Sequence, residues 1–94
     1  MAYSVFNGKD YAPLDSIAFN GLCILRSETP EFFCSEESKP YFSNVMDSPT
    51  WGQVFLESMK AQQATLDFHH CYLEGLKPVK TEDGIAILSF ILGS

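Results

Sequence analysis

The last strand-forming segment of the chain, residues 85–92, is the feature that most limits the folds open to it. It reads Ile-Ala-Ile-Leu-Ser-Phe-Ile-Leu, and its apolar residues occupy both alternating faces. A strand with one face in water alternates apolar and polar residues, so a strand that is apolar on both faces must be covered on both. We therefore expect this strand near the centre of a sheet, or at an interface between subunits.

The segment before it predicts a hairpin. Residues 66–79 form a second extended run, and residues 80–84 join the two runs as an exposed turn that ends in the favoured Asp-Gly pair. Gly75 and Pro78 weaken pairing with a neighbouring strand, because glycine packs no side chain and proline lacks an N–H donor. The well-ordered part of the first run is therefore expected to end near Glu74.

Ser48-Pro49 predicts the start of a helix, because serine is a favoured N-cap and proline is favoured at the first helical position. We expect the helix from about Pro49 to Ala64. Its apolar side is predicted to comprise Trp51, Val54, Phe55 and Met59, with Leu56 on one flank, and its polar side Gln53, Glu57, Lys60 and Gln63. This pattern is typical of a helix laid across one face of a sheet. Gly52 in the first turn indicates close packing there, with the sheet as the expected neighbour.

The first half of the chain gives weaker signals. Residues 2–6 favour a short edge strand before a turn. Residues 16–26 form an apolar run with its only charge at the end, which we interpret as a buried strand. Gly21 within this run favours a β-bulge, and a tight turn at the same place is the alternative. Residues 27–41 hold two prolines and several charges, which predicts a loop or a single helical turn.

These elements define an α+β domain: a small antiparallel sheet of about four strands with one amphipathic helix, about residues 49–64, packed on one face. The chain has 94 residues, which allows a single domain, residues 1–94, because two cores cannot be built from so few residues. Hydrophobic residues make up 46% of the chain, more apolar surface than a small domain readily buries. We therefore expect a homo-oligomer, with a dimer favoured.

Charge and cysteine content indicate which cellular compartment and which binding partners are expected. The net charge of −6 repels phosphate backbones and anionic lipid surfaces, so we expect neither a nucleic-acid nor a membrane partner. No apolar run approaches the ~18 residues of a membrane span, and the first residues lack the pattern of a signal peptide. Cys23, Cys34 and Cys71 are odd in number and have no CxxC spacing, which favours a reduced, cytoplasmic protein without a disulfide framework.

Both histidines lie in one extended stretch together with a cysteine and a carboxylate. Because alternate residues of a strand share a face, His69 and Cys71 should point one way. The other face should carry His70, Tyr72 and Glu74. His69 and Cys71 are weak candidates for a metal site, since zinc needs three or four ligands and the sequence does not identify the others. The competing interpretation is structural: a small buried cysteine beside two half-buried histidines.

The sequence contains no recognisable catalytic constellation. The cysteines have little positive charge nearby to favour a thiolate, and no serine has the Gly-x-Ser-x-Gly context of a hydrolase. The glycines form neither a GxGxxG nor a P-loop pattern, so no cofactor is expected. The leading hypothesis is a small acidic cytoplasmic binding or interaction domain without catalytic activity. The alternative is a small-ligand-binding protein or small enzyme, with a pocket between helix and sheet around Trp51, His69, His70, Tyr72 and Glu74.

Overall fold

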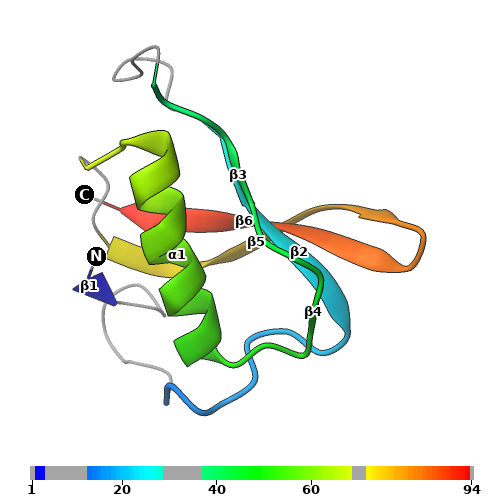
Figure 1. Ribbon diagram of the computed structural model, residues 1–94. Helices are drawn as coiled ribbons and strands as arrows, with labels where there is room; N and C mark the ends of the chain where they lie inside the picture. Colours follow the sequence, from blue (N-terminus) through cyan, green and yellow to red (C-terminus); the bar gives the residue numbers. More distant parts are fainter. Residues whose placement is uncertain (1, 4–12, 29–36, 69–71, 94) are drawn as a thin grey trace.

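One helix lies across one face of a mixed sheet, so the described part of the molecule has two layers (Figure 1). The computed structural model describes residues 2–3, 13–28, 37–68 and 72–93. The elements in chain order are β1 (Ala2–Tyr3), β2 (Leu22–Ser27), β3 (Tyr41–Phe42), β4 (Met46–Asp47), α1 (Trp51–Thr65), β5 (Tyr72–Glu82) and β6 (Ile85–Gly93). The predicted α+β class, with one helix packed on a sheet, is confirmed.

The sheet has the strand order β1-β5-β6-β2-β3, and β4 pairs with the other end of β2. Two pairings are parallel, β2 with β6 and β1 with β5, and the others are antiparallel. The predicted sheet is corrected in two respects, because it has five strand positions instead of four and is mixed instead of antiparallel. The cause is the route of the chain. After β2 it crosses through α1 to β5, and the hairpin then returns β6 beside β2 in the same direction.

The last strand lies inside the sheet, as its two apolar faces predicted. β6 pairs with β5 on one side and with β2 on the other. Its even-numbered residues face α1, and among them Leu88 and Phe90 are buried in the core. Its odd-numbered residues face the opposite way. Ile87 of β6 is opposite Ile24 of β2, so these two strands place apolar side chains on the side of the sheet that faces away from α1.

β5 and β6 form the predicted hairpin, with a tighter turn than expected. Asp83 and Gly84 alone separate the strands, and their φ angles are positive, 52° and 78°. Positive φ at both positions is the conformation that favours Asp-Gly in two-residue hairpins. The prediction that the first strand would end near Glu74 is wrong, because β5 continues to the turn. Register shifts next to Gly75 and Pro78 accommodate both residues within the strand.

The first turn of α1 begins two residues later than predicted. Thr50, and not Ser48, is the N-cap: its hydroxyl accepts from the Gln53 amide at 3.3 Å, and the Gln53 side chain accepts from the Thr50 amide at 2.8 Å. These two hydrogen bonds form a capping box. The Ser48 hydroxyl accepts instead from the Gly21 amide at 3.0 Å. At the other end Leu66, in the left-handed conformation, caps the helix, so the predicted extended run does not begin there.

The buried side of α1 consists mainly of small and polar residues. These residues are Val54, Ser58, Ala61, Gln62 and Thr65. The hydroxyl groups of Ser58 and Thr65 donate to main-chain carbonyls one turn earlier, at 2.6 and 3.0 Å, so both are satisfied within the helix. Met59, predicted on the apolar side, is 41% exposed, and Leu56 is 58% exposed. The prediction that Met59 faces the sheet was wrong, because the small residues of α1 allow the sheet to pack against the side of the helix next to Met59.

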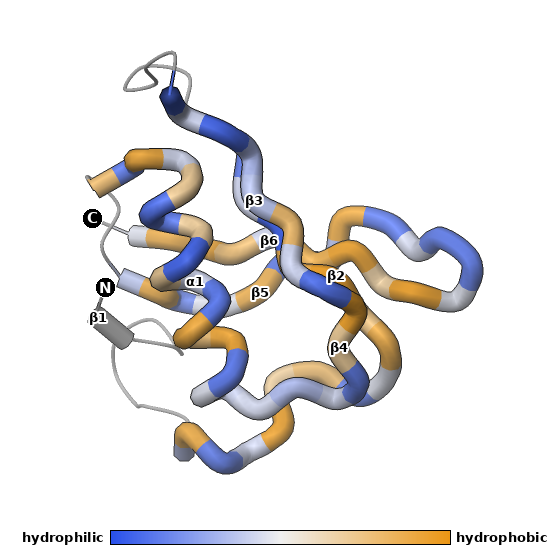
Figure 2. Tube along the Cα trace, viewed as in Figure 1, coloured by the Kyte–Doolittle hydropathy of each residue, from blue (hydrophilic) through white to orange (hydrophobic). Residues whose placement is uncertain are grey.

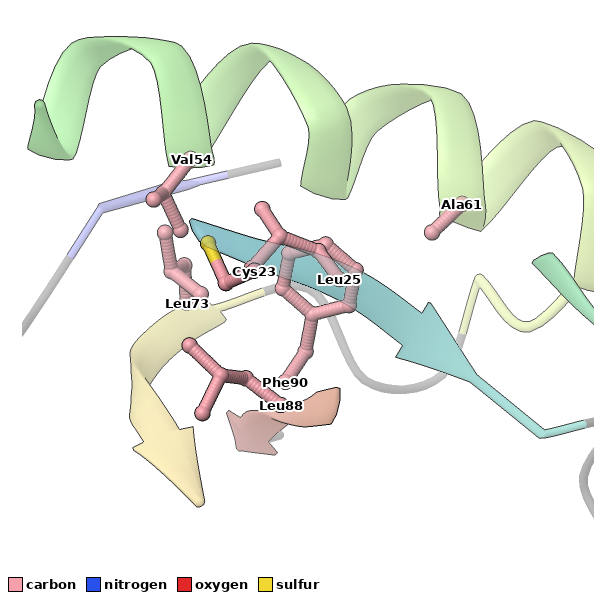
Figure 3. Packing of buried hydrophobic residues seen from close by; sticks show 7 residues of the cluster. All are labelled: Cys23, Leu25, Val54, Ala61, Leu73, Leu88 and Phe90. Atoms are coloured by element: carbon pink, nitrogen blue, oxygen red, sulfur yellow. The ribbon is translucent and has the colours of Figure 1, made fainter. Parts of the chain in front are cut away.

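The core lies between α1 and the sheet and takes residues from the helix, β2, β5 and β6 (Figure 3). Its buried cluster consists of Cys23, Leu25, Val54, Ala61, Leu73, Leu88 and Phe90.

The first turn of α1 packs on a loop. The Gly52 amide donates to the Leu14 carbonyl at 2.8 Å, and a Cβ on Gly52 would lie 3.0 Å from that oxygen. The predicted close approach at Gly52 is confirmed, but its neighbour is this loop and not the sheet.

The apolar run at residues 16–26 is only partly a strand. β2 begins at Leu22, while Ile17 forms an isolated bridge with Thr50 and is exposed. Gly21 has a φ of 116° and precedes β2, so the predicted bulge within a strand is wrong.

At the chain start, β1 lies beside β5 at the edge of the sheet, as predicted for residues 2–3. Residues 4–6 and 29–36, on which two further predictions fall, lie outside the described residues.

Candidate functional site

The residues of the predicted ligand site do not all belong to the described part of the chain. His69, His70 and Cys71 lie outside it, so the predicted metal pair of His69 and Cys71 is outside it as well. Trp51 is the first residue of α1 and packs against the core cluster. Its amide donates to the Ser16 carbonyl at 2.9 Å, which satisfies one of the free amides at the helix start. Trp51 thus has a structural role at the base of the helix.

Tyr72 and Glu74 lie on the other side of the sheet from Trp51. Tyr72 is exposed and precedes Leu73, which faces the core, so the Tyr72 side chain points away from α1. The Glu74 carboxylate occupies the space into which a Cβ on Gly93 would project. The structure therefore does not bring Trp51 together with these two residues, and a ligand site that combines them stays a prediction.

A groove lies between α1 and β4, on the helical side of the sheet. It has a volume of about 420 Å³ and is lined by Met46, Gln53, Leu56, Glu57, Met59 and Lys60. This volume is within the usual range of ~300–1,000 Å³ for small-molecule sites. Sequence reasoning missed the groove because it assigned Met59 to the core. The useful signal was Leu56, a large apolar residue that the sequence pattern left on the flank of the apolar side, three residues before Met59 and on the same side of the helix.

Glu57 organises the polar side of this groove. Tyr41 Oη donates to Glu57 Oε1 at 2.5 Å, and Lys60 Nζ lies 3.0 Å from Glu57 Oε2. The first contact joins β3 to α1, and the second is an i,i+3 ion pair along the helix. Burial, together with the hydrogen bond to Glu57 and its negative charge, raises the pKa of Tyr41 well above its usual range. Tyr41 is therefore a hydrogen-bond donor at every physiological pH.

The outer face of the sheet is a second surface of interest. We use this name for the side opposite α1, whose apolar residues are Leu22, Ile24, Phe42, Ile85, Ile87 and Ile91. The strand register places all six on this side, and Figure 2 shows the apolar character of β2 and β6. Leu22, Phe42 and Ile91 are 45%, 60% and 41% exposed. Central strands with exposed apolar side chains are typical of a surface that another protein covers.

Cys23 is a free thiol in the core and faces α1. Burial and the negative charge of Asp47 raise the pKa of this thiol, which disfavours the reactive thiolate. Its properties in the structure are therefore those of a small apolar core residue. Across residues 2–3, 13–28, 37–68 and 72–93, no group of three or more histidine, cysteine or acidic side chains is placed to hold a metal ion.

These features define a class of protein: within the described residues it is a two-layer α+β domain with exposed apolar side chains on the outer face of its sheet and a groove beside its helix. Comparison with protein families, with curated proteins and with solved structures gave no match. Within the described residues, α1 is too short and too polar to cross a lipid bilayer as a helix. The outer face and the groove are therefore the two surfaces that bear on function.

Proposed function

We propose that this chain is a small cytoplasmic interaction domain, without catalytic activity, that forms homodimers through the outer face of its sheet. One observation carries the proposal: α1 packs on one face of the sheet, and the opposite face exposes apolar side chains of the central strands. Leu22 belongs to β2 and Ile91 to β6, the two innermost long strands. A partner of the same kind would remove these side chains from water.

The sequence of β6 supports the same assignment. A strand in a two-layer domain needs apolar residues only on the face beneath the helix. β6 nevertheless places isoleucine at positions 85, 87 and 91 of its other face, and of these Ile87 is buried within the chain while Ile91 is exposed. Small domains bury a modest share of their surface, about 60% for a chain of ~60 residues, and association covers part of the remainder.

Charge also favours this face for contact between two copies. The chain carries a net charge of −6, so most approaches of one copy to another are repulsive. Of the five basic residues that the structure describes, the strand register places Arg26, Lys77 and Lys80 on the outer face. Lys80 forms an ion pair with Glu82 on the same face. Because its charges are closer to balance, two copies repel each other least here.

The test is the oligomeric state of the purified chain, measured by sedimentation velocity over a wide concentration range. We expect the wild type to sediment as a dimer. Ile91→Glu and Leu22→Glu should each sediment as a monomer, because they place a charge in the apolar contact. Both side chains are substantially exposed in the single chain, so the far-UV circular dichroism of the variants should match that of the wild type.

Leu56→Glu is the matched control, since it makes the same substitution at an exposed leucine on α1, away from the outer face. This variant should remain a dimer. A wild type that is monomeric at every concentration would refute the proposal. So would dissociation caused by Leu56→Glu but not by Ile91→Glu, because it would assign self-association to the helical side.

A further inference from the structure

The charged residues of the outer face are not spread evenly around its apolar residues. Ile24 of β2 pairs with Ile87 of β6 at the middle of the apolar part. Two residues further along both strands, Arg26 pairs with Ser89, and Ser89 pairs in turn with Lys77 of β5. The apolar part is therefore bordered on this side by two cations, and we call this the cationic end of the outer face.

The other end of the apolar part is acidic. At the start of β2, two residues before the central pair, Leu22 pairs with Asp47 of β4. In the hairpin, Ile85 at the start of β6 pairs with Glu82 of β5. The strand register places both acidic residues on the outer face, and we call this the acidic end. Glu82 forms an ion pair with Lys80 at 2.7 Å, but both side chains are more than half exposed, so water weakens this contact.

The cationic end has hydrogen-bond donors that the single chain leaves unused. Arg26 carries five N–H donors, and only Nη2 has a partner, Glu28 Oε1 at 2.8 Å. Its Nε is buried and has no hydrogen-bond partner among the described residues. Lys77 forms no ion pair within the described part of the chain. Because a buried donor without an acceptor is destabilising, this end favours a partner that brings carboxylates.

The free edge of the sheet is a poor place for contact between two copies. β1 pairs with β5 only at residues 72 and 73, so among the described residues the rest of β5 has no neighbour on the side away from β6. Pro78 in this stretch lacks an N–H donor, two register shifts interrupt the strand, and Lys77 and Lys80 add charge. These features hinder the addition of another strand, which leaves contact through the outer face.

We propose that, in the dimer on which this inference rests, the two outer faces meet with their strands antiparallel, so that the cationic end of one copy lies over the acidic end of its partner. A two-fold axis parallel to the strands would place cation over cation. An axis across the strands, through Ile24 and Ile87, exchanges the two ends. The central isoleucines of both copies then pack together, and Lys77 faces Glu82 of the partner subunit. Ile91 lies over the hairpin turn of the partner.

A second acidic residue near the cationic end defines the competing arrangement. Glu74 also lies on the outer face, with its carboxylate over Gly93. An axis between Lys77 and Glu74 would bring these two charges together, but it would be centred near the polar Ser89. Such a dimer would leave Leu22 and the other apolar residues of the acidic end outside the contact. The axis through the central isoleucines removes more apolar surface from water and is therefore favoured.

The test is the dissociation constant of the dimer in charge-reversal variants of the full chain, measured by sedimentation velocity. Lys77→Glu and Glu82→Lys should each weaken the homodimer by roughly 30-fold, because each turns two attractive contacts into repulsive ones. The double variant Lys77→Glu/Glu82→Lys restores opposite charges and should dimerise like the wild type. Lys39→Glu, the matched control, changes the net charge equally at an exposed lysine beside the end of α1, and it should leave the dissociation constant unchanged.

A mixture of the two single variants tests the reciprocity of the contact. When Lys77→Glu and Glu82→Lys are mixed 1:1, opposite charges meet at both symmetry-related contacts. A heterodimer should therefore form at concentrations at which neither variant dimerises alone. Native mass spectrometry with one chain labelled with ¹⁵N measures the fraction of mixed dimer.

The outcomes separate this arrangement from the dimer itself. A dimeric wild type whose dissociation constant is unchanged by Lys77→Glu and Glu82→Lys overturns the arrangement and leaves the proposed dimer in place. The arrangement is also overturned if Glu74→Lys, and not Glu82→Lys, forms the mixed dimer with Lys77→Glu, because the axis would then lie at the competing position. A wild type that is monomeric at every concentration overturns both proposals.

Discussion

Tyr41 is the residue that links β3, the groove and α1. Its hydroxyl donates to Glu57, and its ring packs against the core cluster. The sequence alone gave no sign of this role, because Tyr41 falls at the end of a segment that predicted a loop. The hydrogen bond exists only when β3 pairs with β2 and so brings Tyr41 over the helix. A residue whose partner lies 16 positions away depends on the tertiary fold.

The raised pKa of Tyr41 predicts a loss of stability in alkaline solution. An unfolded tyrosine has a pKa of about 10, and burial with the contact to Glu57 raises the folded pKa above it. Below pH ~10 the contribution of Tyr41 to the free energy of unfolding is fully present. As pH rises further, the unfolded chain loses this proton before the folded one does, so the free energy of unfolding falls.

Urea unfolding at pH values on both sides of 10 measures this effect. Tyr41→Phe should be less stable than the wild type by about 1 kcal/mol at neutral pH, the usual value of one hydrogen bond. The variant should also lose less stability on going to alkaline pH. Glu57→Gln, which keeps an acceptor but removes the charge, should give an intermediate slope. Equal alkaline losses in the wild type and Tyr41→Phe would contradict the assignment.

At the scale of elements, the start of α1 is stabilised by two sets of partners. The amides of Trp51 and Gly52 donate to carbonyls of the loop that precedes β2, at Ser16 and Leu14. The next amide is satisfied by the Thr50 hydroxyl of the capping box. The first three helical amides, which have no partner within a helix, are thereby paired. The loop and the cap act together to fix where α1 begins.

Thr50→Ala should therefore lower the free energy of unfolding by about 1 kcal/mol, because it removes the cap but leaves the loop contacts in place. Thr50→Ser keeps the hydroxyl and should recover most of this loss. Thermal or urea unfolding of the two variants provides the measurement. Gln63→Ala, at an exposed position within α1, is expected to be close to neutral. An unchanged stability in Thr50→Ala would place the helix start elsewhere.

The elements show which patterns in the sequence are reliable. The hairpin and the helix were predicted because their signals are local: an Asp-Gly turn and an apolar period near 3.6. The cap was misplaced because Ser48-Pro49 is itself a good helix start, and tertiary contacts decided against it. Ser48 binds the Gly21 amide, and the Pro49 carbonyl accepts from Ala18. The continuation of β5 beyond Gly75 was missed because register shifts depend on the neighbouring strand.

At the scale of the whole molecule, the order of the strands in the sheet could not be predicted from the sequence. The double-sided apolar pattern placed β6 inside the sheet, but it could not select its neighbours or their direction. The parallel pairing of β2 with β6 follows from a crossover through α1, which depends on contacts between distant segments. The groove was missed for a related reason. It appears only when small residues of α1, such as Ser58 and Ala61, are chosen for the interface with the sheet in place of Met59.

The dimer proposal makes a thermodynamic prediction for the whole molecule that does not depend on hydrodynamic size. When unfolding is coupled to dissociation, mass action makes the Tm rise with protein concentration. With an unfolding enthalpy of ~0.7 kcal/mol per residue for both chains, the expected rise is roughly 4 °C for each tenfold increase in concentration. Differential scanning calorimetry or fluorescence can resolve such a shift.

The Ile91→Glu variant separates this effect from simple loss of stability. A monomeric variant should have a Tm that is independent of concentration, whatever its absolute value, since no dissociation accompanies its unfolding. Leu56→Glu should retain the slope of the wild type, because its side chain lies on α1 and outside the outer face. A wild-type Tm that does not change with concentration would mean that the apolar residues of β2 and β6 are tolerated in water by a single chain.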